Sequence, residues 1–298
     1  VRREVVRVYT PGTLYDHELL PAGEANFLSA LCYAPLSSSE NTTLANRFGL
    51  ASLDLSTGEF WISESWMKHS LQSVVDELVR LEPKEVIFPA QLQEAMTSAF
   101  QSLPIARIVP RDATTFGLEE SKTILTRIFQ VNHVEDLNLH GLQFGLQAAG
   151  GLLHYLAETQ PTLTHAHIRR PWIRLLEHEM QLDQTTLRNL EVLKPVSEQR
   201  QSPTLLTTLD KTKTPMGTRL LRQWIVRPLT QVTAIQLRQE AVKELVLNLG
   251  IRMTIRDHLK SVQDLERLNS RIVLEVANPR DLINLHRSLE ALLVLQEL

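Results

Sequence analysis

The sequence predicts an α/β domain with a mixed sheet, followed by an all-α domain. Three short apolar runs, at residues 27–33, 48–55 and 60–63, follow one another closely, as the strands of a meander do. Strand and helix periods then alternate, which is typical of a sheet covered by helices. Further along, nearly every segment has the helical period of 3.6 residues. We therefore expect an α/β domain over residues 12–160 and a helical domain over residues 161–298.

The segments of the first domain follow from periodicity and from turn residues. Residues 1–11 are expected to be a linker, with a β-branched strand at 5–9 that runs into the turn Thr10-Pro11-Gly12-Thr13. Gly58 can take the positive φ of a tight turn between the second and third strands. After the meander we expect a helix at 71–81, a strand at 85–88, a helix at 92–100, a strand at 105–109 and helices at 118–129 and 142–156.

Helix-capping residues mark the second domain. Thr214-Pro215 and Asn278-Pro279 each place an N-cap side chain before a proline at the first helical position. Apolar stripes follow at 220–225, 235–249, 265–276 and 282–292, and Gly250 stands just beyond the second stripe as an expected helix end. The last stripe is still running at Leu298, so we expect a partial helical bundle.

Composition limits the class of protein. The 298 residues are 43% hydrophobic and carry a formal net charge of -3, which leaves no domain-wide basic field for DNA phosphates. A single cysteine, Cys32, favours a reducing compartment, and we expect a cytoplasmic chain. No apolar run approaches the ~18 residues of a membrane span. The chain begins at Val1 without a methionine, which indicates a fragment or a processed chain.

Several catalytic motifs are absent from the sequence. The phosphate-binding loop G-x-x-x-x-G-K-S/T does not occur, so we expect no nucleotide cofactor and no catalytic or metal residue in this chain. His178-Glu179 would need a histidine at position 182 for zinc protease chemistry, and Leu182 stands there. His165 and His167 are two ligands without a nearby carboxylate, and we interpret them as solvated loop histidines.

Asp54 is a candidate metal ligand. It lies on an early strand before a Ser-Thr-Gly turn, where two-metal nucleases of the ribonuclease H type begin their acidic cluster. Such a site needs further acids, and the candidates are Asp76, Glu77, Glu85 and Asp112. Asp76 and Glu77 have the spacing of a helix surface. We favour a structural role, in which Asp54 orients its turn through hydrogen bonds.

Basic residues suggest phosphate contacts at two places. Lys211, Lys213 and Arg219 surround the helix start at Thr214, and a helix amino terminus with such neighbours can hold a phosphate. The alternative is that Arg219 and Arg222 lie on the solvent-exposed face of a helix, and that Trp224 lies on the opposite face, buried in the core. The second group is Arg169, Arg170 and Arg174 around Trp172.

Several specific strings together span nearly the whole chain. They are VRREVVRVYTPGT at 1–13, LASLDLSTGEF at 50–60, LDQTTLRNLE at 182–191, LLTTLDKTKTPMGTRLLRQW at 205–224, RPL at 227–229, DLERL at 264–268 and ANPRDL at 277–282. These strings resemble the MutS family of DNA mismatch repair proteins and occur in the order of that family.

The resemblance implies a ribonuclease H-like connector domain without nuclease activity, followed by the first part of the helical core or lever domain. On this basis residues 1–11 lead out of a mismatch-binding domain that the chain lacks. The chain would be a non-catalytic signalling segment that couples mismatch binding to the ATPase. The parent protein would bind mismatched duplex DNA, ATP and magnesium, and would form a homodimer. The family also binds MutL through the connector, which we map to Glu119, Glu120, Ser121 and Lys122.

Two alternatives of other classes stay open at this point. The first is a metal-dependent nuclease built on Asp54, whose cleavage would be lost on Asp54→Asn. The second is a helical scaffold unrelated to repair, in which the strings match by chance.

Overall fold

The chain forms two compact units. A computed structural model describes residues 8–33, 47–66, 71–100, 103, 105–161, 165–196 and 202–297. The first unit, here called the sheet unit, consists of Val1–Leu20 and Asn26–Leu176. The second, the helical unit, consists of Pro21–Ala25 and Glu177–Leu298.

The boundary between the units lies after Leu176, whereas we expected it after residue 160. The reason is a set of backbone hydrogen bonds that the sequence pattern did not reveal. The amide of Arg169 donates to the Gly58 carbonyl at 2.9 Å, and that of Arg174 donates to the Ile62 carbonyl at 2.8 Å. Residues 165–176 therefore belong to the sheet unit.

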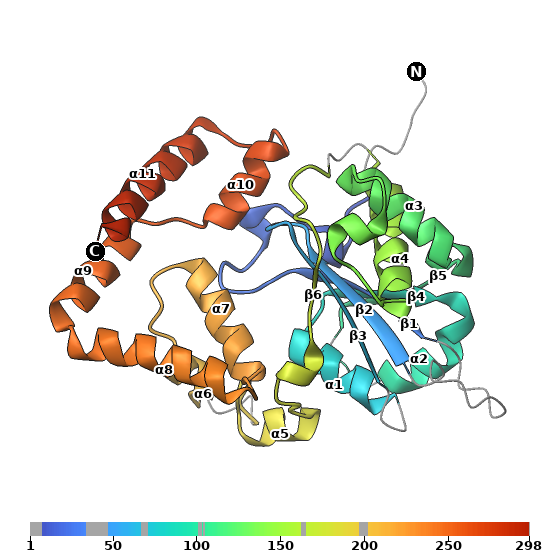
Figure 1. Cartoon of the computed structure of the whole chain (residues 1–298), viewed down its shortest axis with the longest axis horizontal. Helices are drawn as coiled ribbons and strands as arrows, with labels where there is room; N and C mark the ends of the chain where they lie inside the picture. Colours follow the sequence, from blue (N-terminus) through green and yellow to red (C-terminus); the bar gives the residue numbers. More distant parts are fainter. Residues whose placement is uncertain are drawn as a thin grey trace. The chain divides into compact units, whose positions relative to one another are not determined.

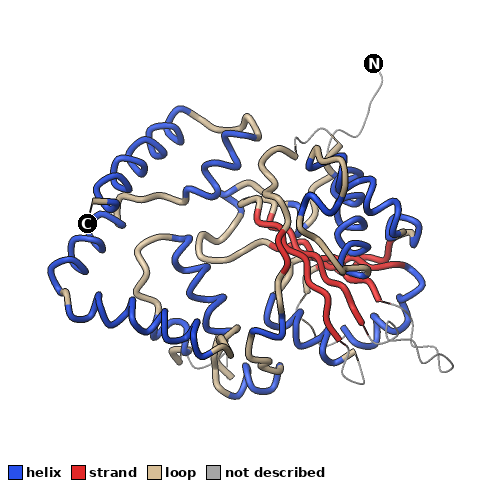
Figure 2. Tube along the Cα trace, viewed as in Figure 1, coloured by secondary structure: helices blue, strands red, loops and turns tan. Residues whose placement is uncertain are grey.

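The sheet is mixed, as predicted. Its strands are β1 (Phe27–Tyr33), β2 (Arg47–Asp54), β3 (Glu59–Trp66), β4 (Glu85–Pro89), β5 (Arg107–Arg111) and β6 (Trp172–Ile173). They lie in the order β5-β4-β1-β2-β3-β6, which Figure 2 shows as red tubes. β1, β2 and β3 are an antiparallel meander, while β4 is parallel to β1, β5 to β4 and β6 to β3. The strand expected at 5–9 falls mostly outside the described residues, and its described end, residues 8 and 9, is not strand.

The turn between β2 and β3 requires a glycine. Asp54 pairs with Glu59 at the end of the hairpin, and Gly58 between them has a φ of 71°. A β-carbon at Gly58 would also overlap the carbonyl of His167. Both the backbone conformation and the close approach of another segment therefore favour glycine here.

Helices cover both faces of this sheet. They are α1 (Gln72–Leu81), α2 (Gln93–Phe100), α3 (Leu118–Phe129) and α4 (Phe144–Thr159). Figure 1 shows α3 and α4 on one face of the sheet and α1 and α2 on the other. Because both faces are covered, every residue of β1 is buried, including Cys32. Burial and the nearby Glu64 raise the pKa of the Cys32 thiol to about 12, so it stays protonated at neutral pH.

A buried acid fixes the start of α4. The Glu64 side chain is fully buried, and its Oε2 accepts hydrogen bonds from the amides of Gln143 at 2.7 Å and Gly145 at 3.0 Å. These amides have no partner within the helix, and a negative charge is favourable at a helix amino terminus. Glu64 thus anchors α4 to β3.

The described part of the helical unit contains α5 (Gln184–Asn189), α6 (Leu205–Leu209), α7 (Pro215–Val226), α8 (Val232–Leu247), α9 (Leu249–Leu259), α10 (Leu265–Val273) and α11 (Pro279–Gln296). Capping residues predicted the starts of α7 and α11. The Thr214 hydroxyl accepts from the Gly217 amide at 3.1 Å, and the side-chain Oδ1 of Asn278 accepts from the Asp281 amide at 3.0 Å. Both expected helix starts are confirmed.

The expected helix end at Gly250 is wrong. α8 ends at Leu247, and Gly250 lies in the first turn of a further helix, α9, which the sequence pattern did not predict. Gly250 has no positive φ and so does not act as a left-handed cap. The break occurs instead at Asn248, whose side chain amide donates back to the Glu244 carbonyl at 3.1 Å.

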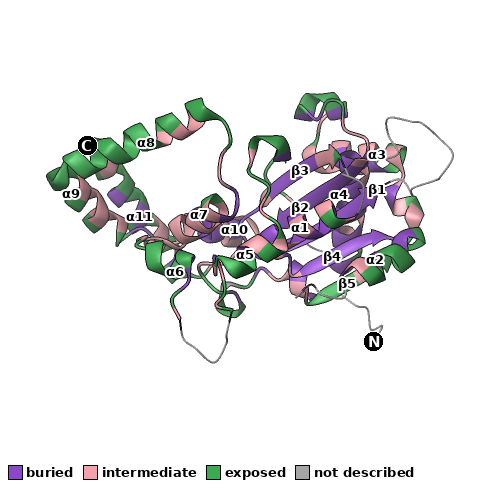
Figure 3. Cartoon of the chain, turned by 90° about the horizontal axis from the view of Figure 1, so that it is seen from below, coloured by how far each residue is buried: buried purple, intermediate pink, exposed green. Residues whose placement is uncertain are grey.

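The apolar stripes of the helical unit are largely exposed among the described residues. α8 and α9 have no buried residue, and Figure 3 shows both mostly in the colour of exposed residues while the strands are buried. Val242 and Leu289 are 59% and 49% exposed. The stripes predicted the helices correctly, but these faces do not form a core here. No helix in the described ranges is long and apolar enough to cross a membrane.

Candidate functional site

Asp54 has the structural role that its sequence context favoured. Its Oδ1 accepts from the Ser56 amide at 2.9 Å and from the Ser56 hydroxyl at 2.6 Å. Its Oδ2 accepts from the Asn26 amide at 2.9 Å. The carboxylate is fully buried, and these donors provide the compensation that a buried charge needs. Asp54 orients its turn and fixes the residue that precedes β1.

The other candidate acids are each engaged in local contacts. Asp76 accepts from the Gln72 side chain on α1, and Asp112 accepts from the amide and hydroxyl of Thr114, which hold the pKa of Asp112 below its usual value. Among the described residues no group of three or more metal-ligating side chains converges. The geometry therefore offers no two-metal cluster in that part of the chain.

Two of these acids are buried. Glu77 is fully buried and pairs with Arg80 at 2.7 Å, so our expectation that Glu77 is helix surface is wrong. Burial of the Glu77 carboxylate is compensated by the opposite charge of Arg80, which lies one turn later on the same helix. Glu85 is also fully buried, at the first residue of β4. It accepts from the Thr10 hydroxyl, from the Gly12 amide at 3.1 Å and from the Tyr155 hydroxyl at 2.7 Å.

The histidines are not solvated, contrary to our interpretation. His167 is 5% exposed, and its Nε2 lies 3.1 Å from the Leu55 carbonyl oxygen. Burial, followed by the positive charge of Arg127, lowers the pKa of His165. The same two causes, in the same order, lower the pKa of His154, with Glu120 opposing them. The close packing of 165–168 against the β2–β3 turn explains the burial, and a loop pattern could not predict it.

These pKa shifts predict an acid-labile sheet unit. Folding lowers the pKa of His154 and His165, so below pH ~6.5 the unfolded chain takes up protons at these groups more readily than the folded chain does. The free energy of unfolding should be independent of these groups above pH ~7.5. It should fall as the pH drops below ~6.5, and solvent screening at these partly exposed groups keeps the fall well below the limit of about 1.4 kcal/mol per pH unit for each histidine. Urea unfolding at pH 7.5 and 5.5 measures the difference.

Replacement of the two histidines should flatten this dependence. His154→Gln with His165→Gln removes both groups, while His140→Gln removes an exposed histidine of the same unit and serves as the control. Equal pH dependence in the double variant and in the control would contradict the prediction.

The predicted docking residues on α3 do not all reach the surface. The Glu119 side chain is 77% exposed and pairs with Lys122, 39% exposed, at 2.7 Å. Glu120 is exposed as well. Ser121 is fully buried, and its hydroxyl donates to the Gly117 carbonyl at 2.7 Å. Ser121 faces α4 at Gly150, where a β-carbon would overlap it, so it is not a surface contact. The remaining three residues present mixed charges on one exposed helix turn.

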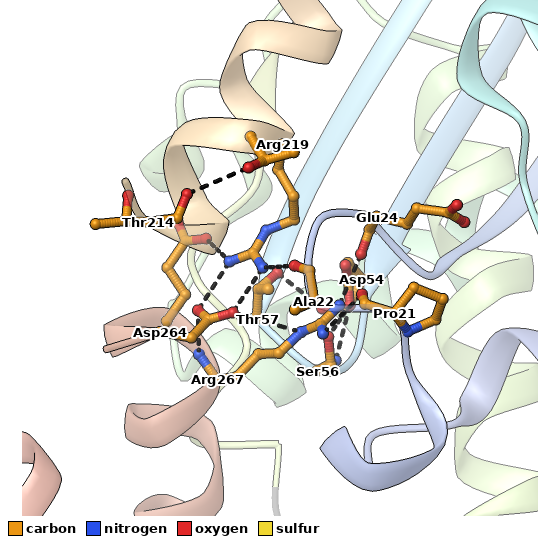
Figure 4. A network of polar contacts seen from close by, with 12 residues as sticks. Pro21, Ala22, Glu24, Asp54, Ser56, Thr57, Thr214, Arg219, Asp264 and Arg267 are labelled. Atoms are coloured by element: carbon orange, nitrogen blue, oxygen red, sulfur yellow. Dashed lines mark hydrogen bonds and ion pairs between the residues drawn. The ribbon is translucent and has the colours of Figure 1, made fainter. Parts of the chain in front are cut away.

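The predicted phosphate-contacting residues differ in their exposure to solvent. Lys211 and Lys213 are exposed before the start of α7, whereas Arg219 is only 6% exposed. The Arg219 guanidinium pairs with Asp264 at 2.6 Å (Figure 4). It also pairs with Glu266 at 2.7 Å. Burial alone would lower the pKa of Arg219, but its hydrogen bonds and the charges of these two carboxylates raise it. Its charge is neutralised within the protein, so Arg219 does not fit the predicted phosphate contact.

The buried face of α7 is the opposite of the one we expected. Its buried residues are Arg219 and Val226, while Trp224, expected in the core, is 41% exposed. The guanidinium of Arg238 lies 3.7 Å from the centre of the Trp224 ring, a cation–π contact. Burial of Arg219 is possible because two carboxylates face it. The apolar periodicity of α7 cannot predict these carboxylates, because they lie on another helix.

The second basic group is partly buried. Arg174 is 7% exposed, and its guanidinium lies 5.2 Å from the ring centre of Trp61 and 5.8 Å from that of Trp172. Arg169 and Arg170 are exposed, and Trp172 is 47% exposed. Arg174 therefore stacks between aromatic rings and is not placed on the surface to meet phosphate.

Two functional candidates escaped the sequence reasoning. Glu64 carries no local signal for its role, because the amides that it binds lie about eighty residues later. Arg267, 4% exposed, donates to carbonyl groups of the segment Pro21–Ala25 at the other end of the sequence. Its only signal was its place in the string at 264–268.

Comparison with known proteins gives consistent matches along the chain. The family model for MutS domain II matches residues 26–169, and that for MutS domain III matches residues 185–298. The DNA mismatch repair protein MutS of Synechococcus elongatus is 37% identical over 300 residues, which cover 97% of this chain and 32% of that protein. The MutS of Methanosarcina mazei is 37% identical over 295 residues, which cover 98% of this chain and 32% of that protein.

A further relative of similar extent is the MutS of Desulfosudis oleivorans, 37% identical over 294 residues, 98% of this chain and 32% of that protein. The chain thus spans about one third of the length of the curated relatives it matches. Matches of this length exclude the alternative in which the strings resemble a repair protein by chance.

Proposed function

Because the chain belongs to the MutS family of DNA mismatch repair proteins, we propose that it supplies the connector and the first part of the helical core of a mismatch-recognition protein. One observation carries this proposal. The model for domain II falls within the sheet unit, and the model for domain III falls within the helical unit, in the family's order. In this role the chain is structural and non-catalytic, and it transmits signals between other parts of the parent protein.

The sheet unit is proposed to be a ribonuclease H-like connector without nuclease activity. An antiparallel meander followed by two parallel strands and their helices supports this likeness. The engagement of Asp54 by Asn26 and Ser56 supports the loss of nuclease chemistry. A nuclease would keep its carboxylates open toward metal ions.

The helical unit is proposed to couple mismatch binding to an ATPase that lies elsewhere in the parent protein. The sequence contains no phosphate-binding loop, so ATP and magnesium belong to other regions of that protein. Mismatched duplex DNA and a second copy of the parent are its further partners, and the cytoplasm is its location. Lys211 and Lys213 remain the proposed phosphate contacts, since both are exposed beside a capped helix start.

The sheet unit is further proposed to dock MutL through the exposed turn of α3 formed by Glu119, Glu120 and Lys122. A compact α/β unit keeps its surface when neighbouring domains are absent, so docking should need neither ATP nor DNA. Mixed charges on this turn suit a polar contact of modest affinity, with electrostatics setting its specificity.

Charge reversal tests this docking surface. Lys122→Glu breaks the pair with Glu119 and places three acids on one turn, so capture of the cognate MutL amino-terminal domain should weaken at least about fivefold. Arg222→Glu, on α7 of the helical unit, is the control and should leave capture unchanged. Interferometry with the whole chain provides the dissociation constants.

Two outcomes would count against the proposal. The first is no capture by this chain at tens of micromolar when the full-length protein binds clearly. The second is equal capture by Lys122→Glu and Arg222→Glu, which would place the docking surface elsewhere.

A further inference from the structure

The segment Pro21–Ala25 is held by two buried arginines of the helical unit. Arg267 donates from Nη1 to the Pro21 carbonyl at 3.1 Å and from Nη2 to the Glu24 carbonyl at 2.7 Å. Arg219 donates from Nη1 to the Ala22 carbonyl at 2.9 Å. Figure 4 shows both guanidinium groups directed at these carbonyls. Three of the five carbonyls in the segment therefore accept hydrogen bonds from charged donors, which are stronger than those from neutral ones.

Carboxylates of α10 fix the arginines. Asp264, the N-cap of α10, accepts from both ends of the Arg219 fork at 2.6 and 2.8 Å, and its Oδ2 lies 3.9 Å from the Nε of Arg267. Glu266 accepts from Arg219 at 2.7 Å. Arg219 and Arg267 are 6% and 4% exposed. Their orientation is set by these contacts, so the donors that face the segment are preorganised.

The segment also lies against α7. A β-carbon at Gly23 would lie 2.8 Å from the methyl carbon of Thr218, which is closer than side chains pack. Glycine permits this approach. The segment is thus enclosed by α7 through Thr218 and Arg219 and by α10 through Arg267.

Immediately after this segment the chain is anchored in the sheet unit. The Asn26 amide donates to Asp54 at 2.9 Å, and its side chain amide donates to the carbonyls of Pro11 and Leu14 at 3.0 and 3.2 Å. Only Ala25 separates Glu24, held by Arg267, from Asn26. One residue spans at most about 3.6 Å, so the link has little slack.

We propose that Arg219 and Arg267 are positioning residues that make Pro21–Ala25 a taut link, through which movement of α7 and α10 reaches the start of β1. This inference rests on the coupling role proposed above and assigns that role to particular residues. A covalent link without slack transmits displacement directly and needs no packed interface for the purpose.

Hydrogen exchange of the whole chain tests the link. In Arg267→Gln, amide exchange across residues 22–27 should rise at least about tenfold, because the donors to Pro21 and Glu24 are lost. Exchange within α7 at 220–226 should change much less. Arg267→Lys keeps the charge and should restore part of the protection.

The matched control is Arg227→Gln. Arg227 is also buried, and it pairs with Glu179 at 3.0 Å. It should leave exchange at 22–27 unchanged. If Arg267→Gln does not fold, Gly23→Ala takes its place, since it pushes the segment away from Thr218 while keeping every charge.

Lengthening the link tests whether it transmits movement to the start of β1. With three glycines inserted after Ala25, Arg267→Gln should still free residues 22–25 but should no longer affect Asn26 and Phe27. Unchanged exchange at 22–25 in both Arg267→Gln and Gly23→Ala, or an effect on Asn26 that persists through the insertion, would overturn the inference. If the unmodified chain does not capture MutL but the exchange results are as expected, the docking proposal is contradicted and the inference about the link is not.

Discussion

Replacement of Gly49 by alanine should lower the free energy of unfolding of the sheet unit by more than about 3 kcal/mol. Gly49 lies in the middle of β2, paired with Cys32 on one side and Glu64 on the other. A β-carbon there would overlap the backbone of Phe144 and Gly145, the first residues of α4. Neither side can yield easily, because β2 is a central strand and the start of α4 is held by Glu64. The loss comes from moving a helix away from the sheet.

Denaturant unfolding followed by tryptophan fluorescence measures this effect. Gly250→Ala is the control, since Gly250 lies in α9 and the added carbon would meet no atom within 4 Å beyond its chain neighbours and the backbone of its own helix. It should stabilise the helical unit slightly, by up to about 1 kcal/mol, because alanine favours helix over glycine. A loss below about 1 kcal/mol for Gly49→Ala would mean that α4 does not approach β2 closely.

Replacement of Glu85 by alanine should cost the same unit about 3–5 kcal/mol. The carboxylate is fully buried and accepts from Thr10, Gly12 and Tyr155, and it pairs with Arg107 at 3.5 Å. Removal leaves buried donors without an acceptor, and each such donor carries a desolvation penalty. The change also releases the turn at 10–13 from the start of β4.

The isosteric variant separates the effect of charge from that of shape. Glu85→Gln keeps one accepting oxygen and should lose clearly less than Glu85→Ala in urea unfolding. Glu94→Ala removes an exposed acid in the first turn of α2 and should change stability by no more than about 0.5 kcal/mol. A loss for Glu85→Ala as small as that for Glu94→Ala would contradict the role of Glu85 as a buried acceptor.

Local chemistry made much of this fold predictable. The three strands of the meander have contiguous apolar runs, and Gly58 supplies the conformation of their second turn. Threonine and asparagine before proline marked the starts of α7 and α11, because an N-cap acts within three residues of itself. The turn-orienting role of Asp54 was equally local, since Ser56 lies two residues away.

Side-chain placement depended on partners that are distant in sequence. Periodicity assigned Arg219 to a solvent-exposed face and Trp224 to the core. Arg219 is nevertheless buried, because it pairs with carboxylates forty-five and forty-seven residues away. Ser121 was placed on a docking surface, but it packs against Gly150 on another helix. In both cases the sequence identified the helix correctly and its orientation incorrectly.

The sequence by itself determined the order of the elements, most of their ends and the family, because backbone propensities, caps and motif strings act over a few residues. Only the tertiary structure decided which charges are buried, that residues 165–176 belong to the sheet unit, and that Pro21–Ala25 belongs to the helical unit. The physical reason is that burying a charge or a carbonyl costs free energy unless a partner is present. The partner of Arg267 at Pro21 lies 246 residues away along the chain, where no local pattern reaches.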